Sequence, residues 1–258
     1  MKKFFQIQHL VLVSATFLIF MFFGCSKENI KMNSLTPEEQ FSEAKRIFDK
    51  RDFYKAKMQF TVLVMNNPGS TVIEDGQFYL AECHFNLKEY LLAISEYEKL
   101  IKSLPQSSYV DDARNKMGLC YEKLSPGYGL DQDYTQKAIS QYQQFLEDYT
   151  TSELRPVVEK HLSECRDKLG KKEYMTGELY RKMGYNTSAL ISFNNVLETY
   201  NDTQYVDDAL FWKGECLRKL KDKAGALDAY QTLITRFADS AYGDRARARI
   251  KEMVKETK

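Results

Sequence analysis

Cys25 is the residue whose surroundings best indicate a chemical fate. It follows Gly24 at the end of the apolar run Leu10 to Phe23, and Lys2 and Lys3 stand ahead of that run. A positive start, a short apolar stretch and a small residue are the three parts of a secretory signal. The run is too short to cross about 30 Å of hydrocarbon at about 1.5 Å per residue. We therefore expect residues 1–24 to be removed and the thiol of Cys25 to carry a lipid.

An uncleaved membrane anchor is the alternative interpretation of the same segment. Both interpretations place the rest of the chain outside the cytoplasm and next to a membrane. Residues 26–35 are polar, so we expect residues 25–35 to form a flexible, lipidated tether.

The remaining sequence lacks the patterns of catalytic and metal-binding residues. His84 and His161 are the only histidines after the signal, and neither stands in an H-E-x-x-H frame. A G-x-S-x-G elbow and a G-x-x-x-x-G-K phosphate loop are also missing. Asp131 and Asp133 begin like a calcium loop, but the glycine and glutamate required later in such a loop are replaced. We expect no catalytic residue, no metal and no cofactor, and hence no enzyme.

The charge balance points to protein partners. The formal net charge is +1, and removing the signal with its two lysines changes it to −1. A nearly neutral chain has no bulk field to attract nucleic acid. We expect no nucleic-acid partner.

Four cysteines remain after Cys25. Cys83, Cys120 and Cys216 occupy the same local frame, which suggests one position of a repeated unit. Equivalent positions on stacked helices lie about 10 Å apart, beyond the roughly 7 Å limit for a disulfide. We expect buried free thiols, while a bridge involving Cys165 stays open.

One sequence motif occurs three times, at residues 104–113, 200–209 and 237–246. Each version has a large apolar residue, then Ser or Thr, then Tyr, Asp and Ala at fixed offsets. The pattern indicates a helix end, a short turn and a new helix. Ser107, Thr203 and Ser240 could each accept a hydrogen bond from an amide at that new helix start.

Between these motifs, a small residue in one helix is followed twelve residues later by an alanine in the next helix. The pairs are Ala44 and Ala56, Ala81 and Ala93, Gly177 and Ala189, and Gly214 and Ala226. Four residues after each alanine comes an aromatic, which would fill the space left by the small residue: Phe60, Tyr97, Phe193 and Tyr230. This pattern resembles the tetratricopeptide repeat, a helical hairpin of about 34 residues.

A third unit fits if eight residues are inserted within 125–133, with Gly118, Ala138 and Tyr142 in the repeat positions. We therefore predict an all-α, right-handed solenoid of about five hairpins without any sheet. One extra helix, about 153–169, and a C-terminal helix from about Tyr242 complete it. The hairpins are expected at 36–67, 74–104, 111–149, 170–200 and 207–237.

The first helix of each hairpin should line the concave face of the solenoid. Its inward positions carry aromatics in the first two units, which predicts a peptide-binding groove formed by Phe41, Phe48, Phe78 and Phe85. Lys45 could meet a carboxylate of the peptide. The alternative is that these aromatics cover neighbouring helices or the tether.

Three features together resemble one family. They are Gly24-Cys25, the five-unit array, and the insert Ser125-Pro-Gly-Tyr-Gly-Leu-Asp-Gln-Asp133 followed by Thr135 and Ala138. The family is that of the outer-membrane assembly lipoproteins known as BamD, also called YfiO or ComL. The resemblance covers essentially the whole chain after the signal.

The resemblance implies a subunit of the machinery that folds and inserts β-barrel proteins into the outer membrane. It implies a periplasmic location, a membrane anchor through acylated Cys25, and sorting to the outer membrane with which Ser26 is compatible. The N-terminal repeats, 36–149, would recognise targeting strands of unfolded β-barrel proteins, which end in an aromatic residue. The C-terminal half, 150–258, would dock on the barrel core subunit, and other accessory lipoproteins would be further partners. The alternative is a periplasmic scaffold for cell-wall or division proteins, which would not need the insert.

Overall fold

The structure is a computed structural model that describes residues 35–255. The predicted signal, Cys25 and almost all of the predicted tether lie outside the described residues. Within them, all regular elements are helices: α2 (Pro37–Asp49), α3 (Phe53–Asn66), α4 (Ile73–Asn86), α5 (Tyr90–Ser103), α6 (Val110–Leu124), α7 (Asp133–Asp148), α8 (Arg155–Lys182), α9 (Asn186–Thr199), α10 (Val206–Lys219), α11 (Lys223–Arg236) and α12 (Gly243–Lys255). Between residues 35 and 255, no helix has both the length and the apolar character needed to cross a bilayer.

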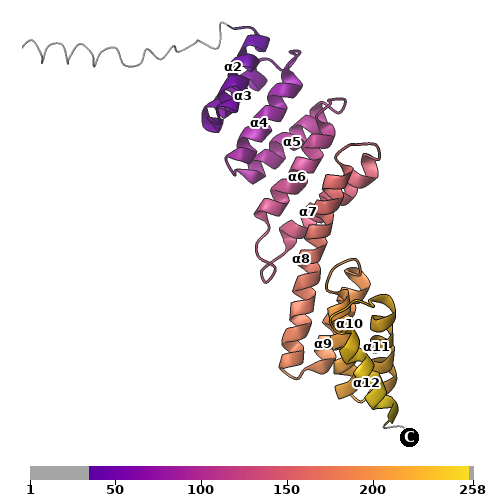
Figure 1. The fold of residues 1–258 in the computed structure, drawn as a ribbon. Coiled ribbons are helices and arrows are strands. Elements are labelled where there is room, and N and C mark those ends of the chain that lie inside the picture. The colour runs from indigo at the N-terminus through magenta and orange to yellow at the C-terminus, as the bar shows by residue number, and fades with distance from the viewer. Residues whose placement is uncertain (1–34, 256–258) are drawn as a thin grey trace, which may run out of the picture.

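The helices stack in chain order, each packed on the one before it (Figure 1). Consecutive antiparallel pairs form the predicted hairpins, and four of the five predicted ranges match the helices to within a residue or two. Such a stack buries its apolar surface between neighbouring units, so the core is a row of linked clusters. The prediction of an all-helical repeat solenoid is confirmed.

Side-chain caps mark where α2, α3 and α11 begin. Thr36 and Glu39 form a reciprocal capping box at the start of α2, with Pro37 at the first helical position. The side chains of Asp52 and Asp222 accept hydrogen bonds from the amides of Lys55 and Gly225, at equivalent starts of α3 and α11.

The predicted contacts between small and aromatic residues set the spacing within each hairpin. A Cβ atom on Gly214 would lie 2.5 Å from Cε1 of Tyr230, and one on Gly177 would lie 2.6 Å from Cε1 of Phe193. Both aromatic side chains are fully buried. Each ring therefore lies against the small residue of its own hairpin.

The structure corrects the helices expected at 153–169 and 170–200. The extra helix and the first helix of the fourth hairpin are one continuous helix, α8, of 28 residues. Gly170 lies inside it without ending it, because a single glycine costs a helix only about 1 kcal/mol. Thr203 occupies the space beside this glycine, 2.8 Å from where a Cβ would be.

Of the three hydrogen bonds predicted at helix starts, the one at Thr203 is wrong. Oγ of Ser107 and of Ser240 accepts a hydrogen bond from the amide two residues ahead, at 3.2 Å in both cases. The hydroxyl of Thr203 instead donates to the carbonyl oxygen of Tyr200 at 2.7 Å. Thr203 is buried against α8, where this carbonyl satisfies its hydroxyl.

All four cysteines among the described residues, Cys83, Cys120, Cys165 and Cys216, are buried free thiols, as predicted. Burial raises the pKa of Cys83, Cys120 and Cys165 to about 12 and that of Cys216 to about 11. They behave as small apolar residues of the core.

Candidate functional site

The predicted groove residues of α2 converge on a residue of α4 that sequence reasoning missed, Tyr79. The ring centroids of Phe41 and Phe48 lie 5.9 and 5.2 Å from that of Tyr79. Nζ of Lys45 lies 5.0 Å from the same centroid. Phe41, Lys45 and Phe48 share one face of α2 because their spacing of four and three residues matches the helical repeat. We call these four residues the Tyr79 cluster.

The Tyr79 cluster combines a positive charge with aromatic rings that are only partly buried. The side chain of Lys45 is 31% exposed and its Nζ donates to Oδ1 of Asp49 at 2.5 Å. This hydrogen bond raises the pKa of Lys45, so the ammonium group stays charged at neutral pH. An exposed pair of this kind contributes little stability, so an incoming carboxylate could compete with Asp49.

Phe78 and Phe85 are the other two predicted groove residues. Phe78 is only 9% exposed and stacks on Tyr109, with centroids 4.4 Å apart. Phe85 packs edge-on against Tyr90 and lies under Nζ of Lys116 at 4.9 Å. Among residues 35–255, no ring contact joins either of them directly to Phe41 or Phe48. Phe78 does contact Tyr79, with ring centroids 5.8 Å apart, so three of the four phenylalanines touch this tyrosine, whereas the contacts of Phe85 are with Tyr90 and Lys116.

The repeat positions of Phe48 and Tyr79 are also in contact in other units, but they carry different types of residue there. The last turn of one hairpin's first helix packs on the middle of the next hairpin's first helix. The equivalent pairs are Phe85 with Lys116, at 4.9 Å, and Arg181 with Trp212, at 3.8 Å. The signal that could have revealed Tyr79 is that Trp212 occupies the same repeat position.

Acids that are partly or fully buried on the first helices are neutralised by the next unit. Glu82 accepts a hydrogen bond from Tyr97 and pairs with Nζ of Lys116 at 2.8 Å. Glu215 accepts from Tyr230 at 2.7 Å and from Nε of Arg249 at 2.8 Å. These contacts tie each hairpin to its successor, and they leave these carboxylates occupied by protein donors.

The insert 125–133 is held against α8. Nζ of Lys168 donates to Oγ of Ser125 at 2.5 Å, and Nζ of Lys172 donates to the carbonyl oxygen of Leu130 at 2.9 Å. The side-chain amide of Gln132 donates to the carbonyl oxygens of Gly127 and Leu130. Thr135 donates to Oε1 of Gln132. The Ser, Gln and Thr of the insert motif therefore have structural roles in closing this loop.

Metal-ligating side chains gather away from the Tyr79 cluster. Among the described residues, the group that could hold an ion is Glu122 on α6 with His161 and Glu164 on α8. No spacing in the sequence predicts this group, since its residues come from two separated helices.

Comparison with solved structures finds helical-repeat proteins. The chain is similar to the TPR2AB domain of yeast Sti1 in its complex with pHSP90, at 16% identity and a TM-score of 0.44, covering 85% of this chain and 84% of that one. It is also similar to a tetratricopeptide repeat protein from Parabacteroides merdae, at 14% identity and a TM-score of 0.37, covering 84% of this chain and 73% of that one. A third similar structure is that of PilW, a type IV pilus biogenesis factor, at 14% identity and a TM-score of 0.39, covering 80% of this chain and 95% of that one.

No curated protein matches the chain. The model of one protein family does match it: YfiO, described as an outer membrane lipoprotein, over residues 33–229. This range contains all of α2 to α10, the insert and the first half of α11 in one alignment. It also contains the Tyr79 cluster. Because the match spans well over half of its length, the chain belongs to the YfiO family of outer membrane lipoproteins.

Proposed function

We propose that the protein is a non-enzymatic lipoprotein subunit of the β-barrel assembly machinery. It is held at the periplasmic face of the outer membrane by lipid on Cys25. Its N-terminal repeats bind the targeting strands of unfolded β-barrel proteins, and its C-terminal half docks on the barrel core subunit. Family membership supports association with the outer membrane and a role in protein interaction. The observation that carries the client-binding part is the Tyr79 cluster.

The chemistry of this cluster fits the end of a targeting strand. Such a strand presents an aromatic ring next to its terminal carboxylate. The ring would pack on Phe41, Phe48 and Tyr79, and each aromatic pair contributes about 0.5–1.5 kcal/mol beyond the buried area. The carboxylate would take the place of Asp49 beside the ammonium group of Lys45, as a charge-assisted hydrogen bond.

Exposed apolar side chains near the end of α8 support docking by the C-terminal half. Met175, Leu179 and Met183 follow one another at intervals of four residues, so they share a face of the helix. Leu179 and Met183 are 57% and 56% exposed. Apolar side chains gathered on one exposed face are typical of a protein interface.

Client binding is tested with a fluorescent peptide that has the sequence of a β-barrel protein's last strand. Phe48→Ala and Lys45→Met should each weaken binding by about tenfold, which corresponds to about 1.4 kcal/mol. Tyr54→Ala removes an aromatic that is 63% exposed on α3 and is the matched control. A peptide amidated at its C-terminus should bind wild type as weakly as the free acid binds Lys45→Met. Equal affinities for all variants would refute the Tyr79 cluster as the client site.

Docking is tested by purifying the lipidated protein from detergent-extracted membranes and identifying what accompanies it. Wild type should recover a large outer-membrane barrel protein with periplasmic domains, and Leu179→Glu with Met183→Glu should lose it. The double variant should keep its affinity for the client peptide. Recovery of cell-wall enzymes or division proteins in place of the barrel protein would favour a periplasmic scaffold.

A further inference from the structure

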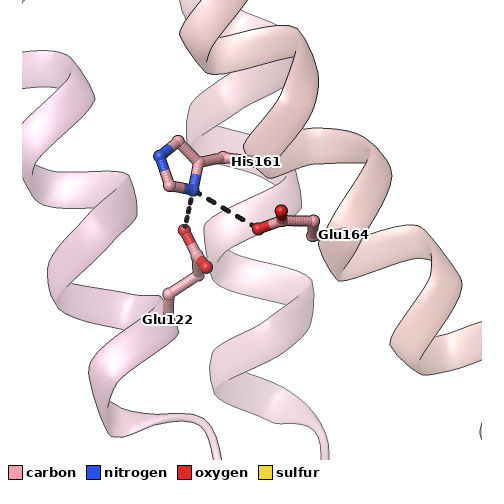
Figure 2. A group of neighbouring side chains, drawn as sticks. All are labelled: Glu122, His161 and Glu164. Atoms are coloured by element: carbon pink, nitrogen blue, oxygen red, sulfur yellow. Dashed lines mark ion pairs between the residues drawn. The ribbon is translucent and has the colours of Figure 1, made fainter.

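The joint between α6 and α8 brings together one histidine and two glutamates. Nδ1 of His161 lies 3.0 Å from Oε2 of Glu122 and 3.9 Å from Oε2 of Glu164 (Figure 2). The possible ligand atoms of all three residues lie within 4.8 Å of one another. Figure 2 shows both carboxylates directed at the same nitrogen of the ring. From this arrangement we propose that Glu122, His161 and Glu164 bind a divalent transition-metal ion of the zinc class.

The spacing of the ligand atoms suits such an ion. Zinc bonds to histidine nitrogen and carboxylate oxygen measure about 2.0–2.2 Å, so tetrahedral neighbours lie about 3.4 Å apart. The two distances from Nδ1, 3.0 and 3.9 Å, bracket that value. The side chain of Glu164 is 54% exposed, so it can rotate to close the longer gap. One imidazole with two carboxylates favours zinc over calcium or magnesium, which prefer oxygen ligands alone.

An ordinary ion pair between His161 and Glu122 is the competing explanation. It leaves an observation unexplained, because Nδ1 of His161 is shielded from solvent yet makes no hydrogen bond of acceptable geometry. The carboxylate oxygen is close enough, but it does not lie in the direction that a hydrogen bond from the ring requires. A buried nitrogen without a hydrogen bond is costly, and a metal ion would satisfy it.

His84 shows what a satisfied pair looks like in the same chain. Its Nδ1 is hydrogen-bonded to Oε2 of Glu89 at 2.6 Å, and Nζ of Lys57 lies 2.9 Å from the same oxygen. That carboxylate is already neutralised by a lysine, so it has no need of a metal ion. His84 therefore provides a matched control.

Tyr142 holds two of the three ligands in place. It is fully buried, its ring stacks on that of His161 with centroids 5.7 Å apart, and its hydroxyl donates to Oε2 of Glu122. A buried group that orients metal ligands in this way typically strengthens the site. Lys168 is held by Ser125, to which it donates at 2.5 Å. Exposed Lys160 pairs loosely with Glu164, at 3.8 Å from Oε1, whereas Oε2 of Glu164 faces His161.

The ion would join α6, the first helix of the third hairpin, to the first half of α8. It would act as a structural metal ion that stabilises the packing between the two halves of the solenoid. No catalytic step is part of this proposal.

The test is calorimetric titration of zinc chloride into untagged, detergent-extracted full-length protein that has been treated with a chelator. Wild type should bind one ion, and its thermal midpoint should rise when zinc is added. Glu164→Gln should weaken binding at least tenfold, and because Glu164 is exposed this variant should fold normally. His161→Ala should abolish binding, whereas His84→Ala should bind like wild type.

Cobalt provides a second readout that identifies the ligands. The visible spectrum of the cobalt-loaded protein should show nitrogen and oxygen coordination and should lose its intensity in His161→Ala. A thiolate charge-transfer band would place the metal at a buried cysteine and overturn the proposal. Zinc binding that is equal in wild type, Glu164→Gln and His161→Ala would overturn it as well.

Discussion

The hydroxyl of Tyr230 donates a hydrogen bond to Oε1 of Glu215 at 2.7 Å, inside the last hairpin. Arg249 of α12 and Arg218 also donate to this carboxylate, at 2.8 and 3.2 Å. Burial raises the pKa of Glu215, but these three donors outweigh burial, so the pKa lies below its ordinary value. The carboxylate thereby fixes the C-terminal helix to the repeat array.

Glu215→Gln should lower the free energy of unfolding at pH 7 by about 1–3 kcal/mol, because it weakens a buried set of charge-assisted hydrogen bonds. A carboxyl group with a lowered pKa stabilises the fold above its unfolded pKa, near 4.5, and loses this effect as the pH falls through the folded value. The difference between wild type and variant should therefore shrink between pH 5 and pH 3. Urea unfolding across this range measures it, with exposed Glu198→Gln as control. A difference that is the same at every pH would contradict the assignment.

The tight turns within the hairpins place ordinary residues in the left-handed region. Lys88 has φ 63°, and the equivalent position after α8 is Gly184, with φ 86°. A side chain in this region costs about 1–2 kcal/mol, and glycine recovers most of it at an entropic cost of about 0.5–1 kcal/mol. Lys88→Gly should therefore stabilise the protein by about 0.5 kcal/mol, while Lys88→Ala should change little. Gly184→Ala should destabilise it by about 1 kcal/mol, and thermal denaturation of all three variants checks this.

Ser125 provides a test of whether the insert is structural. Its Oγ lies 2.5 Å from the hydroxyl of Thr135 and accepts from Lys168 of α8. Ser125→Ala would leave Lys168 without this acceptor, and half-buried donors left unpaired cost about 1–3 kcal/mol. We expect a loss of about 1 kcal/mol in urea unfolding, and no change for exposed Ser140→Ala. If Ser125→Ala instead weakens binding of a partner without affecting stability, the insert is a contact surface.

The buried thiols should be unreactive in the folded protein. Their raised pKa values, about 11 to 12, leave almost no thiolate at pH 8, and thiolate is the reactive form. An aromatic disulfide reagent should label none of Cys83, Cys120, Cys165 and Cys216 until denaturant is added, and should then label all four. Rapid labelling of one cysteine under native conditions would reveal local opening at that unit.

The hairpins could be predicted because their spacing is set by local, repeated contacts. Gly214 with Tyr230 and Gly177 with Phe193 mark the same close approach of two helices, so the sequence shows the same signal each time. The continuity of α8 could not be predicted from this signal. The spacing of the repeats predicted a helix boundary at Gly170. A glycine does not end a helix by itself, however, and here Thr203 packs into the space beside Gly170 while the helix continues.

The candidate site was predicted in part. The residues of α2 were found because their spacing puts them on one face. Tyr79 was missed since its position is polar or aliphatic in three other units, and Phe78 turned out to be nearly buried by Tyr109, a residue of the following turn. The group of Glu122, His161 and Glu164 depends on where α8 lies relative to α6, which no local pattern in the chain encodes.

The unbroken α8 fixes both the distance and the rotation between the two halves of the molecule. At about 1.5 Å per residue, its 28 residues form a strut of about 42 Å. Each residue also turns the helix by about 100°, so a single alanine inserted near its middle would swing α9–α12 around the axis while every hairpin kept its own packing. Four inserted residues would restore nearly the original facing at a greater length. If assembly of outer-membrane β-barrel proteins fails with one inserted residue and returns with four, the two halves must face their partners in a set direction.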